Sequence, residues 1–286
     1  MKISALFEKY RVRRLRNASE RTVQLYSVAR NNFRKHHTQC EPAIKHLTDD
    51  DLAAFALARR GTVAPATINR DLYCLLALWR FAHSERLVDR LPTIELEREP
   101  QRTPVAWTID EIRTIVSTAR GLKGRVGDYP ANIWWTSLLL VCFDTAERIG
   151  AVMDLTWQNV SLRDRWVIFP AETRKGSTAD SVMSIHWSTA DLLEELRPYR
   201  GKVFRWPYCR EYLWNRYRKL LKRANVPTGR ARGFHCIRKT TASYAAANGG
   251  DPAKLLRHHD RRVTDAYLDP RIVGPTEAWH HIPWRP

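Results

Sequence analysis

Residues 255 to 270 read LLRHHDRRVTDAYLDP, a basic and histidine-rich stretch that contains a single tyrosine. Two adjacent histidines, His258 and His259, precede Arg261 and Arg262, and Tyr267 follows nine residues after the first histidine. Taken alone, the stretch fits an exposed basic turn with a packed tyrosine, because charge runs usually form solvated faces. The rest of the chain decides whether this tyrosine has a chemical role.

The whole chain is strongly basic. It has 286 residues, enough for one large or two ordinary domains, and 48 Lys and Arg against 30 Asp and Glu give a net charge of +18. The expected partner is a polyanion. Nucleic acid is favoured over a membrane surface because the charge runs along the whole chain and is not gathered on one amphipathic helix. The alternative is a merely basic soluble protein.

The sequence also indicates where the protein works. The N-terminus turns charged after seven residues, and the longest apolar run, 133–143, is too short to span a bilayer. The cysteines are odd in number and form no C-x-x-C pair, which indicates free thiols in a reducing compartment; they are Cys40, Cys74, Cys142, Cys209 and Cys236. We therefore expect a cytoplasmic, nucleoid-associated protein with no membrane partner.

The first hundred residues have the pattern of helices. Ser19 is a good cap for the run SERTVQLYSVARNNFRKH, and Thr48 and Asp51 have capping-box spacing. Pro65 stands where a first helical turn tolerates it, and apolar residues follow it at helical spacing. These signals predict a small helical domain over residues 1–92.

A proline-containing stretch without helical period follows, which predicts a linker at 93–106. Thr108 and Glu111 then form another capping-box pattern, and the apolar run 133–143 has the length of a buried helix. β-Branched residues on both sides of RKGSTAD predict two strands joined by a turn. The sequence thus predicts a mainly α fold with a small β-hairpin or sheet, of the α+β class, and a second domain over 107–286.

Polar residues with possible chemical roles occur in four clusters, of which the stretch at 255–270 is the last. Arg148 follows the most apolar run of the chain, and a guanidinium near a core is costly unless it pairs with an anion. The simplest interpretation is a salt bridge to Glu147, Asp154 or another acid. Lys175 lies in the predicted turn between the strands, where exposed lysines are ordinary.

The remaining cluster is GFHCIRKTTAS, in which His235 and Arg238 are three residues apart and share a helical face. A capping histidine packed near an arginine is the simpler alternative to a functional pair.

In this order the four clusters resemble the tyrosine recombinase or phage integrase family. TAERIGAVMDLTW resembles the family's first arginine box and TRKGS its hairpin lysine, while FHCIRKTTAS matches its H-x-x-R box. The last box has a histidine, a threonine six residues later and a tyrosine nine residues later, which here are His258, Thr264 and Tyr267. The resemblance is strong over about residues 105–270. It implies a SAM-like helical core-binding domain at 1–92, which binds DNA, and an integrase-type catalytic domain with a C-terminal tail at 107–286.

Three positions depart from the family pattern. Ala151 stands where the first box often carries an acid, and Arg257 and His259 flank His258 where the family usually has glycine and serine. These departures concern the groups that support the site and its contacts to DNA more than the chemistry itself.

The resemblance implies that Tyr267 attacks a DNA phosphodiester and forms a 3′-phosphotyrosyl bond, while Lys175 protonates the departing 5′-oxygen. Arg148 and Arg238 would donate to the phosphate oxygens, His258 would donate a further hydrogen bond, and His235 would be an acid/base partner of the tyrosine. Such a reaction crowds negative charge onto phosphate oxygens, so a preorganised cluster of cations lowers its barrier.

The implied enzyme is a site-specific recombinase that integrates, excises or resolves DNA of a mobile element, and assembles on double-stranded DNA as a tetrameric synapse. No cofactor or metal is expected, since no acid or cysteine completes a familiar ligand spacing with His235, His258 and His259. A type IB topoisomerase and a DNA-binding regulator that has lost catalysis are the alternatives.

Overall fold

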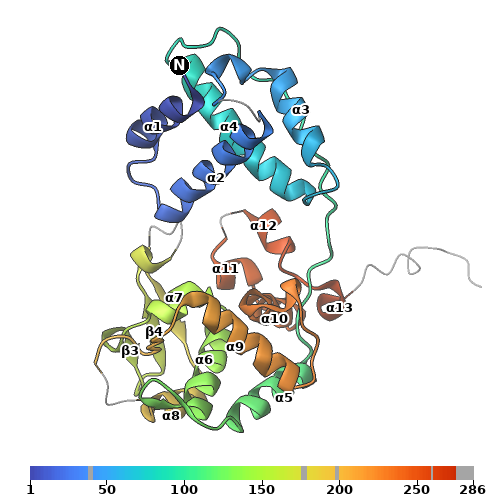
Figure 1. Ribbon diagram of the computed structural model, residues 1–286. Coiled ribbons are helices and arrows are strands. Elements are labelled where there is room, and N and C mark those ends of the chain that lie inside the picture. The colour runs from blue at the N-terminus through green and yellow to red at the C-terminus, as the bar shows by residue number, and fades with distance from the viewer. Residues whose placement is uncertain (38–40, 175–178, 197–199, 259, 275–286) are drawn as a thin grey trace, which may run out of the picture. The chain divides into compact units, whose positions relative to one another are not determined.

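A computed structural model describes residues 1–37, 41–174, 179–196, 200–258 and 260–274 (Figure 1). Three residues named above, Cys40, Lys175 and His259, lie outside these ranges, as does the tail beyond residue 274. The chain divides into two compact units, Met1–Gln101 and Arg102–Pro286, and each unit has its own hydrophobic core. The dividing point falls within the segment 93–106.

The described part of the first unit is helical. It contains α1 (Ile3–Arg14), α2 (Glu20–His36), the short 3-10 helix η1 (Ile44–His46), α3 (Asp49–Arg59) and α4 (Pro65–Ser84). Ser19 caps α2 by accepting a hydrogen bond from the backbone N–H of Thr22, and Thr48 caps α3 by accepting one from Asp51. Pro65 opens α4, the position where its missing N–H costs nothing. The predicted caps therefore set the starts of three helices.

The segment that follows α4 packs against the first unit. Asn69, which is 3% exposed on α4, donates to the carbonyl of Glu97 (2.8 Å) and accepts from the backbone N–H of Glu97 (2.7 Å). The same side chain also donates to the carboxylate of Glu99 (2.6 Å), and Arg60 forms an ion pair with Glu97 (3.0 Å). These bonds fix a stretch whose sequence lacks any periodic pattern.

The second unit is mainly helical with two small sheets. Its helices are α5 (Ile109–Arg120), α6 (Ala131–Thr145), α7 (Ile149–Asp154), α8 (Trp187–Glu194), α9 (Arg210–Arg223), α10 (Phe234–Ala247), α11 (Pro252–Leu256), α12 (Arg261–Asp265) and α13 (Pro270–Val273). The strands are β1 (Arg125–Val126), β2 (Tyr129–Pro130), β3 (Val160–Ser161), β4 (Trp166–Phe169) and β5 (Ser181–Ser184); the 3-10 helices are η2 (Trp157–Asn159), η3 (Ala171–Thr173) and η4 (Arg230–Arg232).

The apolar helix α6 lies at the centre of the second unit. It contacts α5, α8 and α10 as well as β5, which explains why its sequence is apolar all round. Strands β3, β4 and β5 form an antiparallel sheet in that order, with Val167 opposite Met183. The predicted capping box at Thr108 and Glu111 is present with both of its hydrogen bonds and begins α5.

The α+β fold class predicted from the sequence is confirmed. The stretch at 255–270 is not a plain turn, because it contains the end of α11, all of α12 and the start of α13. The sequence analysis predicted none of these short helices, nor the strands β1, β2 and β3. No helix of the described ranges is both long and apolar enough to cross a membrane.

The bonds of Asn69 yield a prediction about proteolysis. Asn69→Ala removes three hydrogen bonds that hold residues 97–99, each contributing about 1 kcal/mol, so local opening should become at least about tenfold more frequent. Glutamyl endopeptidase should therefore cut after Glu97 and Glu99 about that much faster, as followed by mass spectrometry. Asn248→Ala, on an exposed asparagine of the other unit, is the matched control. Equal rates for the variant and the parent would show that the segment is held by other contacts.

Candidate active site

Arg238 is the most enclosed cation of the second unit's described part. Its side chain on α10 is 2% exposed. Nη1 donates to the carbonyl of Ala146 at the end of α6, and Nη2 donates to the carbonyl of Leu256 at the end of α11 (2.9 Å). The last carbonyls of a helix have no intrahelical partner, so the guanidinium satisfies two helix ends at once. The Nε atom is buried and has no hydrogen-bond partner within the described ranges.

A single buried carboxylate, Glu147, organises the arginines around it. Its side chain is 2% exposed, and Arg174 donates from Nε to its Oε1 atom (2.8 Å). Arg238 lies 3.8 Å from Oε2, and Arg257 lies 3.6 Å from Oε1. The backbone N–H of Arg148 also donates to Oε2 (3.0 Å). Three guanidiniums thus share one negative charge, which leaves the cluster with a net positive charge.

The salt bridge considered for Arg148 is absent from the described part of the chain. Both acids named for that role have other partners, since Glu147 binds the three arginines and Asp154 pairs with Lys202 (2.6 Å). The guanidinium of Arg148, which precedes α7, has no carboxylate within ion-pair distance among the described residues. It is half-buried, so an anion from outside the chain is the group that would pair with it.

Tyr267 lies against two histidine rings. The ring centroids of His235 and His258 are each 4.9 Å from that of Tyr267, and the guanidinium carbon of Arg238 is 5.7 Å from it. His235 does not cap its helix, because Gly233 occupies the N-cap position of α10 and makes no side-chain bond. The capping alternative for this histidine is therefore wrong, and its ring faces the tyrosine instead.

His258 is oriented by the threonine of the same motif. Its Nδ1 atom lies 3.1 Å from the hydroxyl oxygen of Thr264, which is 3% exposed. When the hydroxyl donates to Nδ1, the proton of the ring is on Nε2. That Nε2 atom is buried and has no hydrogen-bond partner in the described part of the chain. In that tautomer, the Nε2–H of His258 is a donor with no acceptor among the described residues.

The pKa values of both histidines beside Tyr267 are lowered. Desolvation and the charges of Lys239, Arg238 and Arg148 lower the pKa of His235 to about 4, although its ring is partly exposed. Desolvation with the charges of Arg238 and Arg148 likewise lowers the pKa of His258. Both imidazoles are therefore neutral at pH 7 in the free protein.

Arg257 has a backbone conformation that normally favours glycine. Its φ is 54°, in the left-handed region, which costs roughly 1–2 kcal/mol for a residue with a β-carbon. The side chain donates from Nη2 to the carbonyl of Val182 (3.2 Å), lies 3.0 Å from the sulfur of Met183, and pairs with Glu147. It thereby joins the residue before His258 to strand β5.

Asp269 holds the chain just beyond Tyr267. This fully buried carboxylate accepts from the backbone N–H of Ala106 (2.8 Å) and pairs with Arg271. Its own N–H donates to the hydroxyl of Ser243 on α10 (2.9 Å). Asp269 also caps α13. Its role was not predicted from the sequence, although an Asp followed by Pro is a typical helix start.

The structure brings together five of the six predicted site residues, namely Arg148, His235, Arg238, His258 and Tyr267. The sixth, Lys175, lies outside the described residues, so its place stays a prediction. Arg174 next to it binds Glu147 and donates to the carbonyl of Ala179 (3.2 Å), which brings the chain on either side of 175–178 together. Sequence reasoning named Glu147 only as a salt-bridge partner and Arg257 only as a departure.

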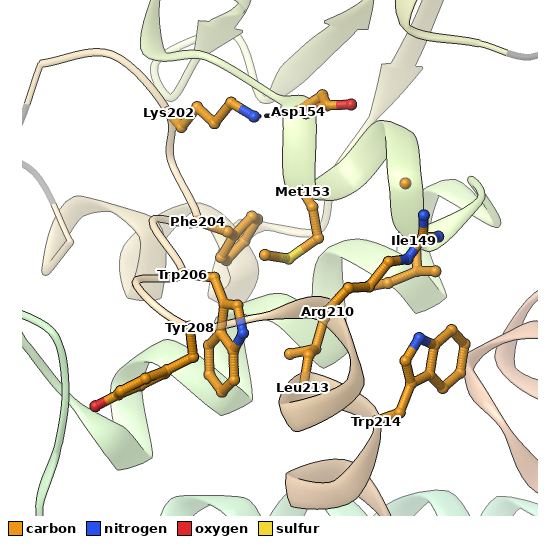
Figure 2. A pocket seen from close by; sticks show the side chains of 11 residues that line it. Ile149, Met153, Asp154, Lys202, Phe204, Trp206, Tyr208, Arg210, Leu213 and Trp214 are labelled. Carbon is orange, nitrogen blue, oxygen red and sulfur yellow. Dashed lines mark hydrogen bonds and ion pairs between the residues drawn. The ribbon is translucent and has the colours of Figure 1, made fainter. Parts of the chain in front are cut away.

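A separate pocket lies beside α7 (Figure 2). Its cavity volume is about 270 Å³, and its walls include Met153, Phe204, Trp206 and Trp214. The ion pair between Lys202 and Asp154 lies at one end. Of the predicted site residues that the structure describes, none lines this pocket, so the chemistry is concentrated around Tyr267 instead.

Known proteins that are similar to this chain are recombinases and integrases. No protein-family model matches the chain. The curated tyrosine recombinase XerD of Halalkalibacterium halodurans is 21% identical over 238 residues, which cover 77% of this chain and 76% of the relative. The chain is similar to the tyrosine recombinases over most of its length. The family resemblance and the enzyme class predicted from the motifs are thus confirmed.

Solved structures of integrases share the fold of this chain at low sequence identity. Residues 75–356 of lambda integrase, a dimer bound to a COC′ core site, give a TM-score of 0.74 at 14% identity, covering 100% of this chain and 99% of that one. The Tn1549 transposon integrase in complex with transposon right end DNA gives 0.75 at 15% identity, covering 94% and 95%. A lambda integrase tetramer bound to a Holliday junction gives 0.73 at 15%, covering 95% and 78%.

Glu147→Gln tests whether the carboxylate holds the cluster. Removing the negative partner of a buried charge group typically costs about 3–5 kcal/mol, because the guanidiniums are left uncompensated. The free energy of unfolding from urea denaturation should fall by about that amount. Glu172→Gln, an exposed glutamate of the same unit, should change it by less than about 0.5 kcal/mol. A loss below about 1 kcal/mol for Glu147→Gln would mean that solvent compensates the arginines.

Proposed function

We propose that this tyrosine recombinase cleaves and rejoins DNA at specific sites through a covalent bond between Tyr267 and a 3′-phosphate. The observation that supports the proposal is the set of unpaired donors around the tyrosine. Arg238 Nε and His258 Nε2 are buried without partners in the described part of the chain. An unpaired buried donor costs about 1–3 kcal/mol, and a phosphodiester supplies the acceptors that would remove this cost.

The proposed reaction balances without a cofactor. The phenol oxygen of Tyr267 attacks the phosphorus, the bond from phosphorus to the 5′-oxygen breaks, and a 3′-phosphotyrosyl bond forms. His235, whose ring faces the tyrosine, accepts the phenol proton, and Lys175 donates a proton to the 5′-oxygen. Arg148, Arg238 and His258 donate to the non-bridging oxygens. Attack by a 5′-hydroxyl reverses these steps and rejoins a strand.

Bound DNA would also raise the pKa of His235, the proposed proton acceptor. The positive charges that lower the pKa of His235 belong in part to Arg148 and Arg238, the residues assigned to the phosphate. An anion between them offsets these charges, so the pKa of His235 rises towards its ordinary value when the phosphate is bound. The histidine then becomes a better base at the moment when the tyrosine must lose its proton.

The proposed partner is double-stranded DNA, consistent with the net charge of +18. We assign DNA binding by the helical core-binding domain to residues 1–92 and catalysis to residues 107–286, with 93–106 between them. The lambda integrase structures are a dimer on a core site and a tetramer on a Holliday junction, and the proposed synapse of this chain is likewise a tetramer. The proposed substrate places the protein in the cytoplasm, at the nucleoid.

Covalent capture tests the nucleophile. The protein is incubated with a library of nicked fragments of its source DNA, and adducts that survive denaturation are sequenced and mapped by mass spectrometry. The adduct should carry its phosphate on Tyr267 and should be lost in Tyr267→Phe, because phenylalanine keeps the ring but has no oxygen. Tyr212→Phe, on another exposed tyrosine of the same unit, should form it normally.

Each other outcome of this capture has a distinct meaning. An adduct that persists in Tyr267→Phe refutes the assigned nucleophile. If the parent protein binds DNA but forms no adduct, it is a regulator. Relaxation of supercoiled plasmid without any site preference would indicate a type IB topoisomerase.

A substrate with a good leaving group tests the proposed general acid. Lys175→Ala should slow cleavage by about 10²–10⁴, the usual contribution of a general acid, and leave DNA binding nearly unchanged. A 5′-bridging phosphorothiolate should restore the rate, since its sulfur leaves without protonation. Arg148→Ala serves as the comparison, because the loss of a phosphate donor is not rescued by sulfur. If the phosphorothiolate rescues both variants or neither, Lys175 is not the acid.

A further inference from the structure

A second group of titratable side chains lies in the first unit, and the proposed recombination chemistry does not use it. His37 follows the end of α2, His46 is the last residue of η1, and Asp51 lies in the first turn of α3. One nitrogen of each histidine and one carboxylate oxygen all lie within 4.8 Å of one another. Side chains from three chain segments, the end of α2, η1 and the start of α3, therefore lie close together.

The two histidines and the aspartate are held by other contacts. The ring of His37 packs edge-on against the buried ring of Phe33, with centroids 4.6 Å apart. The hydroxyl of Thr48 donates to Asp51 Oδ2 (2.6 Å), while Oδ1 lies 3.6 Å from His46 Nδ1. A hydrogen bond to the second oxygen of a carboxylate is the usual way in which metal-binding carboxylates are oriented.

An ion pair between His46 and Asp51 accounts for only part of this arrangement. It leaves the Nε2 atom of His37 buried and without a hydrogen-bond partner in the described residues. A neutral imidazole with an unpaired buried nitrogen is the form that coordinates a metal ion.

We propose that His37, His46 and Asp51 bind a divalent transition-metal ion, with zinc as the best match. Two imidazoles and one carboxylate suit zinc, whereas magnesium and calcium prefer all-oxygen shells. In a tetrahedral zinc site the ligand atoms are about 3.3–3.5 Å apart, given bond lengths near 2.0–2.1 Å. The 3.6 Å separation of His46 and Asp51 is close to this value. All three ligand atoms lie within 4.8 Å of one another, so a bound ion would draw the more distant ones closer together.

The bound ion would connect the end of α2 to the start of α3 and so stabilise the first unit. Any ligand that binds the folded form and not the unfolded form raises stability in proportion to the logarithm of its concentration. Three protein ligands leave a fourth position for water. This role is structural, and it does not depend on the reaction proposed for Tyr267.

Metal titration of the full-length, untagged protein tests the site. After EDTA treatment and gel filtration, zinc is added in a calorimeter, and cobalt is added separately to record its visible absorption. The parent protein should bind zinc with a dissociation constant of about 1 µM or lower, show the cobalt bands of a four-coordinate site, and gain thermal stability on zinc addition. His37→Gln and His46→Gln should each lose one equivalent of bound zinc and the stability gain.

Controls separate this site from the other histidines of the chain. His36→Gln changes the adjacent histidine, which is not part of the convergent group, and should bind zinc as the parent does. His235→Gln removes a histidine of the site around Tyr267 and should also keep the full stoichiometry. Circular dichroism confirms that each variant is folded, and the cobalt spectrum of the parent gives a readout that needs no variant. The proposal is overturned if the parent binds no zinc, or if His37→Gln and His46→Gln bind as much as the parent.

Discussion

The site depends on a single buried carboxylate, Glu147, that is shared by three guanidiniums. An ionised acid with 2% of its side chain exposed is tolerated only because its partners lie close, with Arg174 2.8 Å away. Those partners come from the start of the hairpin turn, from α10 and from the residue before His258. One charge therefore fixes the relative positions of segments up to 110 residues apart, since the pair Glu147 and Arg257 spans that interval.

The ratio of charges is as important as the contacts. One carboxylate for three guanidiniums holds the arginines together and still leaves the cluster positive. A second buried acid would satisfy the arginines more fully, and it would also weaken the attraction for a phosphate. Ala151, which stands where the first arginine box often has an acid, is 3% exposed and adds no charge. The carboxylate that organises the arginines is instead the residue directly before Arg148.

Local signals allowed much of the fold to be predicted. Ser19, Thr48 and the pair Thr108 and Glu111 mark helix starts because capping is a contact between residues two or three apart. The motif spacing also placed His258, Thr264 and Tyr267 near one another. These features depend only on neighbours in the sequence, and the structure shows them as expected.

Contacts between distant residues explain what sequence reasoning missed. Two long-range hydrogen bonds stabilise the short helices α11 to α13. Arg238 donates to the carbonyl of Leu256, and Asp269 accepts from the backbone N–H of Ala106. No local sequence pattern predicts either contact. The segment at 97–99 has no period of its own, and its order comes from Asn69 on α4. The left-handed backbone conformation of Arg257 could not be predicted from the sequence either, because an arginine indicates only an exposed charge.

Four titratable groups of the site have lowered pKa values in the free protein. His235, His258, Arg238 and Arg257 all have a pKa below the ordinary value, with desolvation as the largest cause and nearby positive charge as a further one. An anion among these groups therefore raises the proton affinity of the two imidazoles, while the two guanidiniums are charged with or without it. In the proposed reaction, a phosphodiester in this position would pair with the free donors and raise the proton affinity of the histidines in the same step. Because both histidines are neutral in the free protein, it avoids further positive charge around its tyrosine, and His235 keeps the unprotonated nitrogen that the proposed proton transfer requires.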